Sequence, residues 1–279
     1  MIFKAAAIQM RSGTDMARNL SDASELIREA RWLGAQYVTT PEISNIIEAD
    51  KQRLRALARF EAEDISVAGF SELAKSLGIW LNAGSFALKG SGERLVNRSL
   101  LFAPDGSIAA RYDKLHLFDV DLGDAEPIRE SHSFEPGSAA VAAALPWCKI
   151  GMTICYDVRF AALYRALAQN GAAVLNVPAA FTVATGQAHW HVLLRARAIE
   201  TGSFVIAAAQ GGRHDSGRET YGHSLVVSPW GEIIAEAGIE PCVLMAEIDL
   251  AQVASARSRI PALSHDRAFV LNAGGSVAT

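Results

Sequence analysis

Apolar residues in the first part of the chain follow two different spacings. Residues 3–9 form one apolar run of strand length, whereas between residues 19 and 35 apolar side chains recur every three or four positions. The second spacing is that of a helix with one buried face, and Gly34 supplies a helix stop. Residues 36–40 are again rich in β-forming side chains. This stretch therefore predicts strand, helix and strand in succession, which is typical of an α/β fold.

Similar patterns continue along the rest of the chain. They predict helices over residues 50–60, 66–77, 159–170 and 187–201. They predict strands over residues 79–86, 95–103, 107–114, 141–145, 149–155, 173–177, 204–210, 221–228, 232–237 and 242–248. Turns with proline and glycine, at 104–106 and 229–231, are typical of hairpins. Parallel strands combined with hairpins favour mixed sheets covered by helices, and residues 115–136, which show no steady period, predict a long ordered loop.

The composition of the 279-residue chain is that of one globular domain. Half of its residues are hydrophobic and a fifth are charged, and no Pro/Gly/Ser-rich linker divides it. We expect a single domain over residues 1–272, followed by a flexible tail of small and polar residues at 273–279. The 26 basic and 30 acidic residues are interspersed and give a net charge of −4, which indicates neither a nucleic-acid partner nor a membrane surface.

Targeting signals and cysteine content predict a cytoplasmic protein. The N-terminus leads into the first apolar strand without the pattern of a secretion signal, and no apolar run is long enough to span a membrane. The cysteines, Cys148, Cys155 and Cys242, are odd in number and lack CxxC spacing, so neither a disulfide framework nor a zinc site is predicted. His189 and His191 lie on different faces of the predicted helix, outside any HExxH pattern, which argues against a metal site there.

Three chemically reactive residues directly follow predicted strands. Glu42, Lys114 and Cys155 each stand just past a strand-like run, and in α/β sheets reactive groups gather at the carboxyl ends of strands. A carboxylate can take the proton of a thiol, a thiolate can attack a trigonal carbon, and an ammonium with the backbone N–H of Tyr156 can stabilise the oxyanion that forms. Taken singly, each also has a structural explanation, as a helix start, a solvated strand end or a small buried hydrophobe.

The motifs around these residues resemble those of the nitrilase superfamily of carbon–nitrogen hydrolases. Residues 40–42 are similar to the glutamate motif of that family, residues 112–117 to its lysine motif and residues 154–160 to its cysteine motif, in the same order and spacing. The resemblance covers nearly the whole chain. It implies that the glutamate, the lysine and the cysteine form a catalytic triad.

The resemblance also implies the support of the site, the fold and the assembly. Glu130 is similar to the second glutamate of the family, which helps to position lysine and substrate, and the N–H of Tyr156 is implied to bind the oxyanion. The implied fold is a four-layer αββα sandwich with two mixed β-sheets flanked by helices, and the implied assembly is a homodimer or a higher homo-oligomer. The implied partner is a small-molecule amide substrate, and the reaction needs no metal and no organic cofactor.

The C-terminal half resembles the branch of deaminated glutathione amidases and ω-amidases. The similar segments are residues 188–190, 195–200, 207–210, 212–214, 221–224 and 229–231. Among these, 207–210 and 212–214 are closer to the deaminated glutathione amidases. The resemblance thus implies a cysteine-dependent amidase that hydrolyses the linear C–N amide bond of a small carboxylate or α-keto acid through a thioester and releases ammonia. One departure is Ala161 and Ala162, where the family commonly has Pro-Glu, so the helix start is less well specified.

A substrate that carries a carboxylate requires a cation besides the triad lysine. Arg159 is the first candidate, because related carbamoyl-acid hydrolases use that position for carboxylate binding and a guanidinium fork fits a carboxylate. Arg213 and His214, in a glycine-rich loop, are the second candidates, and a surface role for them is an equal alternative.

Other functions stay open on the sequence. Within the superfamily the alternatives are an ω-amidase acting on α-ketoglutaramate-like substrates and a hydrolase of N-carbamoyl acids or nitriles. A catalytically silent binding subunit is a non-enzyme alternative, against which the intact triad argues. A cysteine hydrolase with a different base, His116 or His223, is a further alternative.

Overall fold

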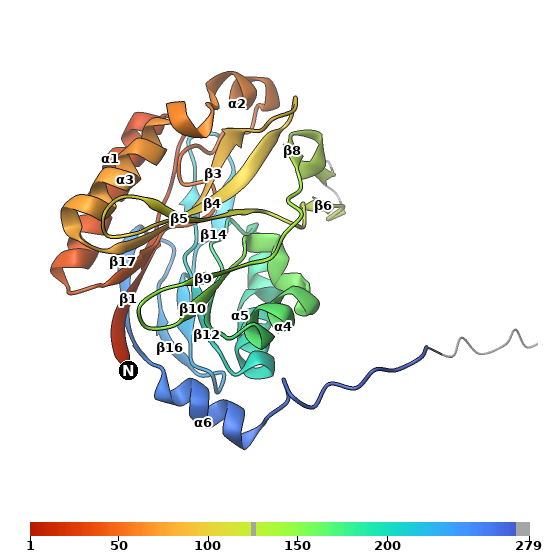
Figure 1. Ribbon diagram of the computed structural model, residues 1–279. Helices are drawn as coiled ribbons and strands as arrows, with labels where there is room; N and C mark the ends of the chain where they lie inside the picture. The colour runs from red at the N-terminus through yellow and green to blue at the C-terminus, as the bar shows by residue number, and fades with distance from the viewer. Residues whose placement is uncertain (124–126, 272–279) are drawn as a thin grey trace, which may run out of the picture.

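The computed structural model describes residues 1–123 and 127–271 (Figure 1), so the tail predicted at 273–279 lies outside the described residues. Its α-helices are α1 (Met16–Trp32), α2 (Lys51–Leu57), α3 (Ile65–Leu77), α4 (Ala161–Gln169), α5 (Val183–Thr201) and α6 (Ala251–Arg259). Short 3-10 helices are η1 (Glu61–Glu63), η2 (Glu130–His132) and η3 (Cys155–Arg159). No helix in this described part of the chain has the length and apolarity needed to cross a membrane.

Two mixed sheets contain most of the strands. The first has the order β17-β1-β2-β3-β4-β5, with β8 beside β4. Its strands are β1 (Ile2–Gln9), β2 (Tyr37–Thr39), β3 (Trp80–Lys89), β4 (Leu95–Phe102), β5 (Ile108–Asp113), β8 (Phe134–Glu135) and β17 (Cys242–Asp249). The second has the order β16-β15-β12-β11-β10-β9, formed by β9 (Val141–Ala144), β10 (Lys149–Met152), β11 (Ala172–Asn176), β12 (Phe204–Ala207), β15 (Leu225–Val227) and β16 (Ile233–Glu236). Two ribbons pair β6 (Asp119–Val120) with β7 (Ile128–Arg129) and β13 (Gly211–Arg213) with β14 (Glu219–Tyr221).

The sheets pack face to face between two pairs of helices. Helices α1 and α3 cover the outer face of the first sheet, and α4 and α5 cover that of the second (Figure 1). Along β1, Phe3, Ala5 and Ala7 belong to the core between the sheets, whereas Ala6 and Ile8 belong to the core under α1 and α3. Because both faces of β1 are buried, its sequence is one continuous apolar run. The predicted four-layer αββα sandwich is confirmed.

Several helices begin and end at residues suited to those positions. Asp15, Asp50 and Asp64 accept hydrogen bonds from free backbone N–H groups in the first turns of α1, α2 and α3. Gly78 ends α3 and Gly202 ends α5 in the left-handed conformation, with φ of +62° and +57°, which a residue without Cβ adopts without strain. The local sequence therefore fixes the ends of the helices that cover the sheets.

Several predicted elements differ from the structure in their bounds: α5 begins at Val183 and not at 187, and β12 ends at Ala207 and not at 210. Two further differences have a cause in the tertiary structure. The helix predicted from residue 159 starts only at Ala161, without a side-chain cap, because the residues before it form η3. The strand predicted over 221–228 is interrupted between β14 and β15, where His223 has a φ of +53°. In both places a tertiary contact of the backbone, described below, replaces the regular pattern.

Two further segments differ from expectation in content. The loop predicted over residues 115–136 contains β6, β7, η2 and β8 in its described part. Helix α6 was not predicted, because it buries only Val253 and Ala256 and so shows little apolar periodicity.

Gly84 lets the loop after β2 pack directly on β3. A Cβ atom at this position would lie 1.9 Å from the carbonyl oxygen of Thr40, 2.4 Å from that of Pro41 and 2.7 Å from Cβ of Pro178. The register of β3 with β4 also shifts at this point, as is common where a strand meets another backbone. The glycine therefore determines how closely the loop after β2 approaches both sheets.

Replacing this glycine tests the close approach. Gly84→Ala should lower the free energy of unfolding by about 3 kcal/mol, because the added methyl group must displace two backbone carbonyls. Urea denaturation followed by circular dichroism measures the change. Gly238→Ala is the matched control, since a Cβ there meets no atom within 4 Å. Equal stability of the two variants would contradict the packing described here.

Candidate active site

One cavity of about 460 Å³ receives residues from the strand ends of both sheets. Glu42 follows β2, Lys114 follows β5 and Cys155 follows β10, and all three line this cavity. Its volume suits a small molecule. The structure thus brings together the three residues that the sequence places after separate strands.

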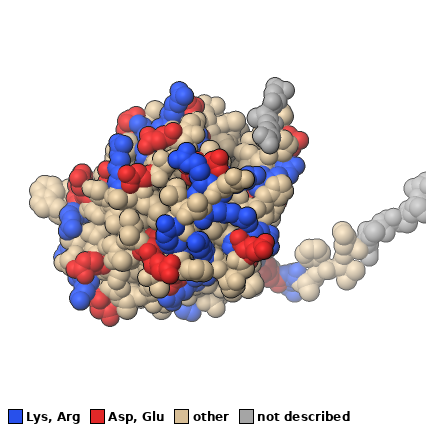
Figure 2. Space-filling model, turned by 90° about the horizontal axis from the view of Figure 1, so that it is seen from above, with Lys and Arg blue, Asp and Glu red and all other residues tan. Residues whose placement is uncertain are grey.

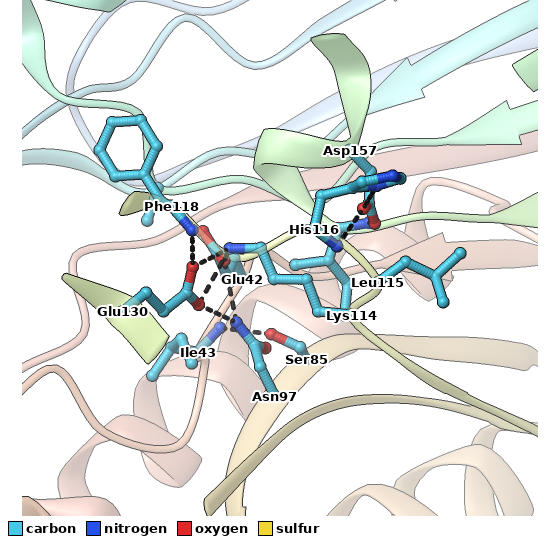
Figure 3. Close-up of polar contacts among 12 residues, drawn as sticks. Glu42, Ile43, Ser85, Asn97, Lys114, Leu115, His116, Phe118, Glu130 and Asp157 are labelled. Atoms are coloured by element: carbon cyan, nitrogen blue, oxygen red, sulfur yellow. Dashed lines mark hydrogen bonds and ion pairs between the residues drawn. The ribbon is translucent and has the colours of Figure 1, made fainter. Parts of the chain in front are cut away.

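Lys114 stands between two carboxylates (Figure 3). Its Nζ lies 2.8 Å from Oε1 of Glu42, and 3.0 and 2.9 Å from Oε1 and Oε2 of Glu130. Lys114 is 2% exposed and Glu42 is 4% exposed. An ammonium buried to this degree stays charged only when opposite charges and hydrogen bonds compensate for the lost water. Glu130 thus lies beside the lysine, where the family resemblance places it.

An amide and a backbone N–H complete the hydrogen bonds of the two carboxylates. Nδ2 of Asn97 lies 3.0 Å from Oε1 of Glu42 and 3.3 Å from Oε1 of Glu130, and donates to both. The N–H of Phe118 donates to Oε2 of Glu130 at 2.6 Å. Sequence reasoning did not single out Asn97. The available signal was its amide within the apolar strand β4, since a buried amide requires partners.

The charges of the site set its resting protonation. Burial opposes ionisation of Glu42, but the Lys114 ammonium and the hydrogen bonds from Lys114 and Cys155 together lower the pKa of Glu42. For Lys114, burial disfavours the charged form, but Glu130 and Glu42 outweigh it and raise its pKa. Burial and the Glu42 carboxylate raise the pKa of the Cys155 thiol well above its ordinary value, although Lys114 opposes them. At neutral pH the site therefore holds a carboxylate, an ammonium and a protonated thiol.

Cys155 is the first residue of η3 and has a strained backbone conformation. Its φ is +48°, in the left-handed region that is costly for a residue with a side chain. Its backbone N–H donates to the carbonyl of Pro178 at 2.8 Å, which holds the turn in place. Ile43, next to Glu42, has a φ of +52°. Strain of this kind commonly occurs at functional sites, where the surrounding structure fixes the backbone.

Asp157 joins the lysine segment to the cysteine segment. Its fully buried carboxylate accepts hydrogen bonds from Oη of Tyr112 at 2.6 Å, the N–H of His116 at 3.1 Å and the N–H of Ile154 at 2.8 Å. Nδ1 of His116 lies 2.7 Å from the same carboxylate. Tyr112 and His116 flank the lysine, and Ile154 precedes the cysteine. One side chain thus holds both reactive residues in position, a role that sequence reasoning did not identify.

The cavity combines apolar walls with cationic side chains. Its apolar lining includes Ile43, Ile46, Leu54, Phe118, Phe134 and Phe181. Lys51, Arg129 and Arg218 also line it. Nη2 of Arg218 donates to the carbonyl of Ala180 at 2.7 Å, while the residue as a whole stays exposed to solvent. Arg218 can therefore meet a charged group of a bound molecule.

Arg159 lies beside the cavity and does not belong to its described lining. Its guanidinium carbon is 5.7 Å from the ring centroids of Tyr156 and Phe181, both of which line the cavity. Its Nη2 is 3.3 Å from Nδ1 of His189. The guanidinium is thus held against aromatic rings, while Tyr156 itself reaches the cavity.

Arg213 and His214 are not brought into the cavity lining among the described residues. Arg213 is exposed on β13. His214 is buried, with Nδ1 2.7 Å from the carbonyl of Ser12 and Nε2 2.7 Å from Oγ1 of Thr220, so both ring nitrogens already have protein partners. Arg218, from the turn that links β13 to β14, lines the cavity instead. The substrate contact expected at Arg213 and His214 stays a prediction, which their positions outside the described lining do not favour.

Fold and site together define a class, the αββα-sandwich hydrolases that hold a cysteine, a glutamate and a lysine in one cavity. Residues 4–258 match the model of the carbon-nitrogen hydrolase family. The chain belongs to this family, which is part of the nitrilase superfamily.

Relatives match almost the whole chain. It is 41% identical over 267 residues to the deaminated glutathione amidase of Bos taurus, and the match covers 94% of this chain and 81% of the relative. It is 37% identical over 265 residues to the omega-amidase NIT2 of Bos taurus, and the match covers 95% of each chain.

Solved structures share the fold. The NitFhit protein of C. elegans matches with a TM-score of 0.89 at 37% identity, over 95% of this chain and 65% of that longer chain. A mutant of the amidase from Nesterenkonia sp. AN1 matches with a TM-score of 0.80 at 25% identity, over 95% of this chain and 94% of that chain. In that amidase the acetamide moiety of fluoroacetamide is added covalently at the active-site cysteine.

Removing the Glu42 charge tests the buried ion cluster. Glu42→Gln should lower the free energy of unfolding by about 2 kcal/mol at neutral pH, because one of the two carboxylates that compensate the ammonium is lost. The folded pKa of Glu42 lies below its ordinary value of 4.5, so its contribution is fully present above pH 4.5 and is lost as the pH falls through the lowered pKa.

Denaturant titrations of the wild type and Glu42→Gln from neutral to acidic pH measure this contribution. The difference between the two proteins should shrink toward acid. Glu93→Gln, at an exposed position, is the control and should show a small difference at every pH. A Glu42→Gln difference that stays constant or grows toward acid would show that the ionised carboxylate does not stabilise the fold.

Proposed function

We propose that this protein is a cysteine-dependent amidase that hydrolyses the C–N bond of a small, carboxylate-bearing amide through a thioester. One observation carries the proposal: Glu42, Lys114 and Cys155 line the same cavity, with the carboxylate in contact with the ammonium and a protonated thiol beside them. The modified cysteine of the Nesterenkonia amidase supports the chemistry. The names of the relatives support the class of substrate.

Attack by Cys155 requires a base, because the raised pKa leaves its thiol protonated at rest. As Sγ bonds to the amide carbon, the thiol proton passes to Glu42 and the carbonyl oxygen becomes an oxyanion. Protonated Glu42 then gives this proton to the amide nitrogen, and the C–N bond breaks. Ammonia, or an amine when the nitrogen is substituted, leaves the site, and the acyl group remains on Cys155 as a thioester.

Water completes the reaction by the same path. Glu42 takes a proton from a water molecule whose oxygen attacks the thioester carbon. The second tetrahedral intermediate collapses, the C–S bond breaks, and the departing sulfur recovers its proton from Glu42. The carboxylic acid product leaves, and the resting protonation of the site is restored.

Lys114 stabilises the oxyanion in both halves of the reaction. At rest its ammonium contacts Glu42 and both oxygens of Glu130. Proton transfer neutralises Glu42 at the moment when negative charge appears on the substrate oxygen. The ammonium therefore turns from Glu42 toward the oxyanion, while Glu130 still holds it and the N–H of Tyr156 donates from the other side.

Arg218 is our candidate for binding the substrate carboxylate. It lines the cavity and is exposed. After burial, Lys114 and Cys155, the charge of Arg218 also acts on the pKa of Glu42 and lowers it, which supports this choice. A guanidinium fork fits a carboxylate bidentately. Deaminated glutathione-like amides and α-ketoglutaramate-like amides both carry such a group.

The geometry disfavours two alternatives. His116 is hydrogen-bonded to Asp157, and His223 lies beside Glu236. Neither histidine belongs to the described lining of the cavity, which disfavours both as the base. A silent binding subunit would not need the buried charge cluster.

An ω-amidase stays the nearest rival, and a hydrolase of N-carbamoyl acids or nitriles ranks behind it. The homodimer and the cytoplasmic location stay predictions.

Trapping the acyl-enzyme tests the nucleophile. Acid-quenched wild-type protein incubated with an amide of a small carboxylic acid should show one added acyl group by intact mass, and digestion should place it on the peptide that contains Cys155. Cys155→Ala should show no adduct and should lose on the order of 10⁴-fold or more in turnover. Cys148→Ala is the matched control and should keep both the acyl adduct and the turnover, since burial raises the pKa of Cys148 to about 11. An adduct that persists in Cys155→Ala would refute the proposal.

Substrate discrimination tests the role of Arg218. Arg218→Gln should raise KM for deaminated glutathione and α-ketoglutaramate by about tenfold or more, because these carboxylate substrates lose a charge-assisted bidentate contact. KM for a neutral amide should stay unchanged. Arg213→Gln is the matched control and should change KM for neither kind of substrate. The ratio of kcat/KM for the two carboxylate substrates separates the two amidase activities. An equal effect of Arg218→Gln on charged and neutral amides would assign the arginine to structure.

A further inference from the structure

Two histidines and a glutamate converge outside the cavity. His191 comes from α5, Glu236 from β16, and His223 from the break between β14 and β15. Nε2 of His191 lies 2.8 Å and Nδ1 of His223 lies 3.3 Å from the same oxygen, Oε1 of Glu236. One potential ligand atom from each side chain lies within 4.8 Å of the others. None of the three belongs to the cavity lining or to the mechanism proposed above.

Buried contacts hold the histidines in place. The N–H of His223 donates to the carbonyl of Gly238 at 2.8 Å, and its carbonyl accepts from Nε1 of Trp190 at 2.8 Å. Trp190 is 1% exposed and directly precedes His191 on α5. The ring of Tyr221 stacks on that of His223, with 4.3 Å between centroids. The two imidazoles are therefore positioned by fixed backbone and aromatic contacts, as a preorganised site requires.

We propose that His191, His223 and Glu236 form a zinc-binding site. Two imidazole nitrogens and one carboxylate oxygen are a ligand set that zinc takes while keeping a further position open. Zinc–ligand bonds of about 2.0–2.1 Å place tetrahedral ligands roughly 3.3 Å apart. The separations of 2.8 and 3.3 Å in the cluster need only side-chain adjustment to reach this spacing. The side chains are 28–36% exposed, so water can fill the open position.

Hydrogen bonds alone explain the arrangement of these three side chains less well than a bound metal does. Without a metal, both rings must direct an N–H at one and the same oxygen of Glu236. A cation at the centre engages the lone pairs of both nitrogens and the carboxylate together. No spacing motif marks this site in the sequence, because its ligands lie on three separate segments. His189, on the same helix, contacts Arg159 instead and is not part of the set.

Zinc at this position would connect α5 to the hairpin of β15 and β16. The same helix has Thr185 in the cavity lining, and a Cβ at Gly186 would lie 2.2 Å from the ring of Tyr221, which stacks on His223. The ion would therefore hold one wall of the cavity in place without contact to the reacting groups. Its expected effect is on stability.

Titration with zinc chloride tests the site. Calorimetry on the metal-free, full-length protein should give one zinc ion per chain, and zinc should raise the melting temperature. His191→Ala and Glu236→Gln should each weaken zinc binding by about tenfold or more and should abolish the rise in melting temperature. Even a residue that only hydrogen-bonds to a metal ligand contributes about tenfold to metal affinity. His189→Ala is the matched control and should bind as the wild type does. Cobalt substituted for zinc should give an absorption spectrum without a thiolate charge-transfer band.

Other results would overturn the proposal. The proposal is overturned if the wild type binds no zinc, or if His191→Ala and Glu236→Gln bind zinc as tightly as the wild type does. It is also overturned if only Cys155→Ala loses binding, because the metal would then lie on the catalytic thiol. The rise in melting temperature is measured for each variant against its own metal-free form. A variant that is less stable without zinc is therefore not mistaken for one that fails to bind zinc. His223→Asn, which tolerates the left-handed backbone, gives an independent third variant.

Discussion

A lysine ammonium buried between two β-sheets is the interaction on which the site depends. Lys114 is almost without contact to water, and it stays charged because Glu42 and Glu130 surround it. The three residues come from distant segments, so the same ion cluster that keeps the charge also joins the loop after β2, the end of β5 and the segment before β8. Asn97 binds both carboxylates and leaves them little freedom to separate. Stability and chemistry therefore share one set of contacts.

Burial also raises the pKa of the Cys155 thiol. Burial and the Glu42 carboxylate keep the Cys155 thiol protonated, so in the proposed mechanism its reactivity depends on passing a proton to Glu42. This requires close positioning of groups from both sheets. Asp157 supplies it by binding the lysine segment and the cysteine segment at once, and the strained turn at Cys155 is retained because these contacts fix it.

Local sequence was informative wherever burial imposes a simple period. Strands buried on both faces are nearly continuous apolar runs, and a reactive residue directly after such a run lies at the end of a sheet strand, which is why the sequence indicates Glu42 and Cys155. Lys114 follows β5, whose faces are only partly buried, and is indicated by its place at the end of a hairpin strand. Glu130 came from the family resemblance and not from any pattern, because the segment around it has no period. Where burial is slight, as in α6, the pattern was too weak to predict the helix.

The sequence by itself determined the alternation of elements and the residues at the strand ends, because both follow from neighbours along the chain. Only the tertiary structure decided which side chains turn into the cavity. Arg213, His214 and Arg218 lie within one ribbon and its turn, yet only Arg218 lines the cavity, since the packing of the ribbon on the sandwich sets its direction. Asn97, Asp157 and the zinc-binding cluster likewise depend on contacts between segments far apart in the chain, whose distances no local spacing encodes.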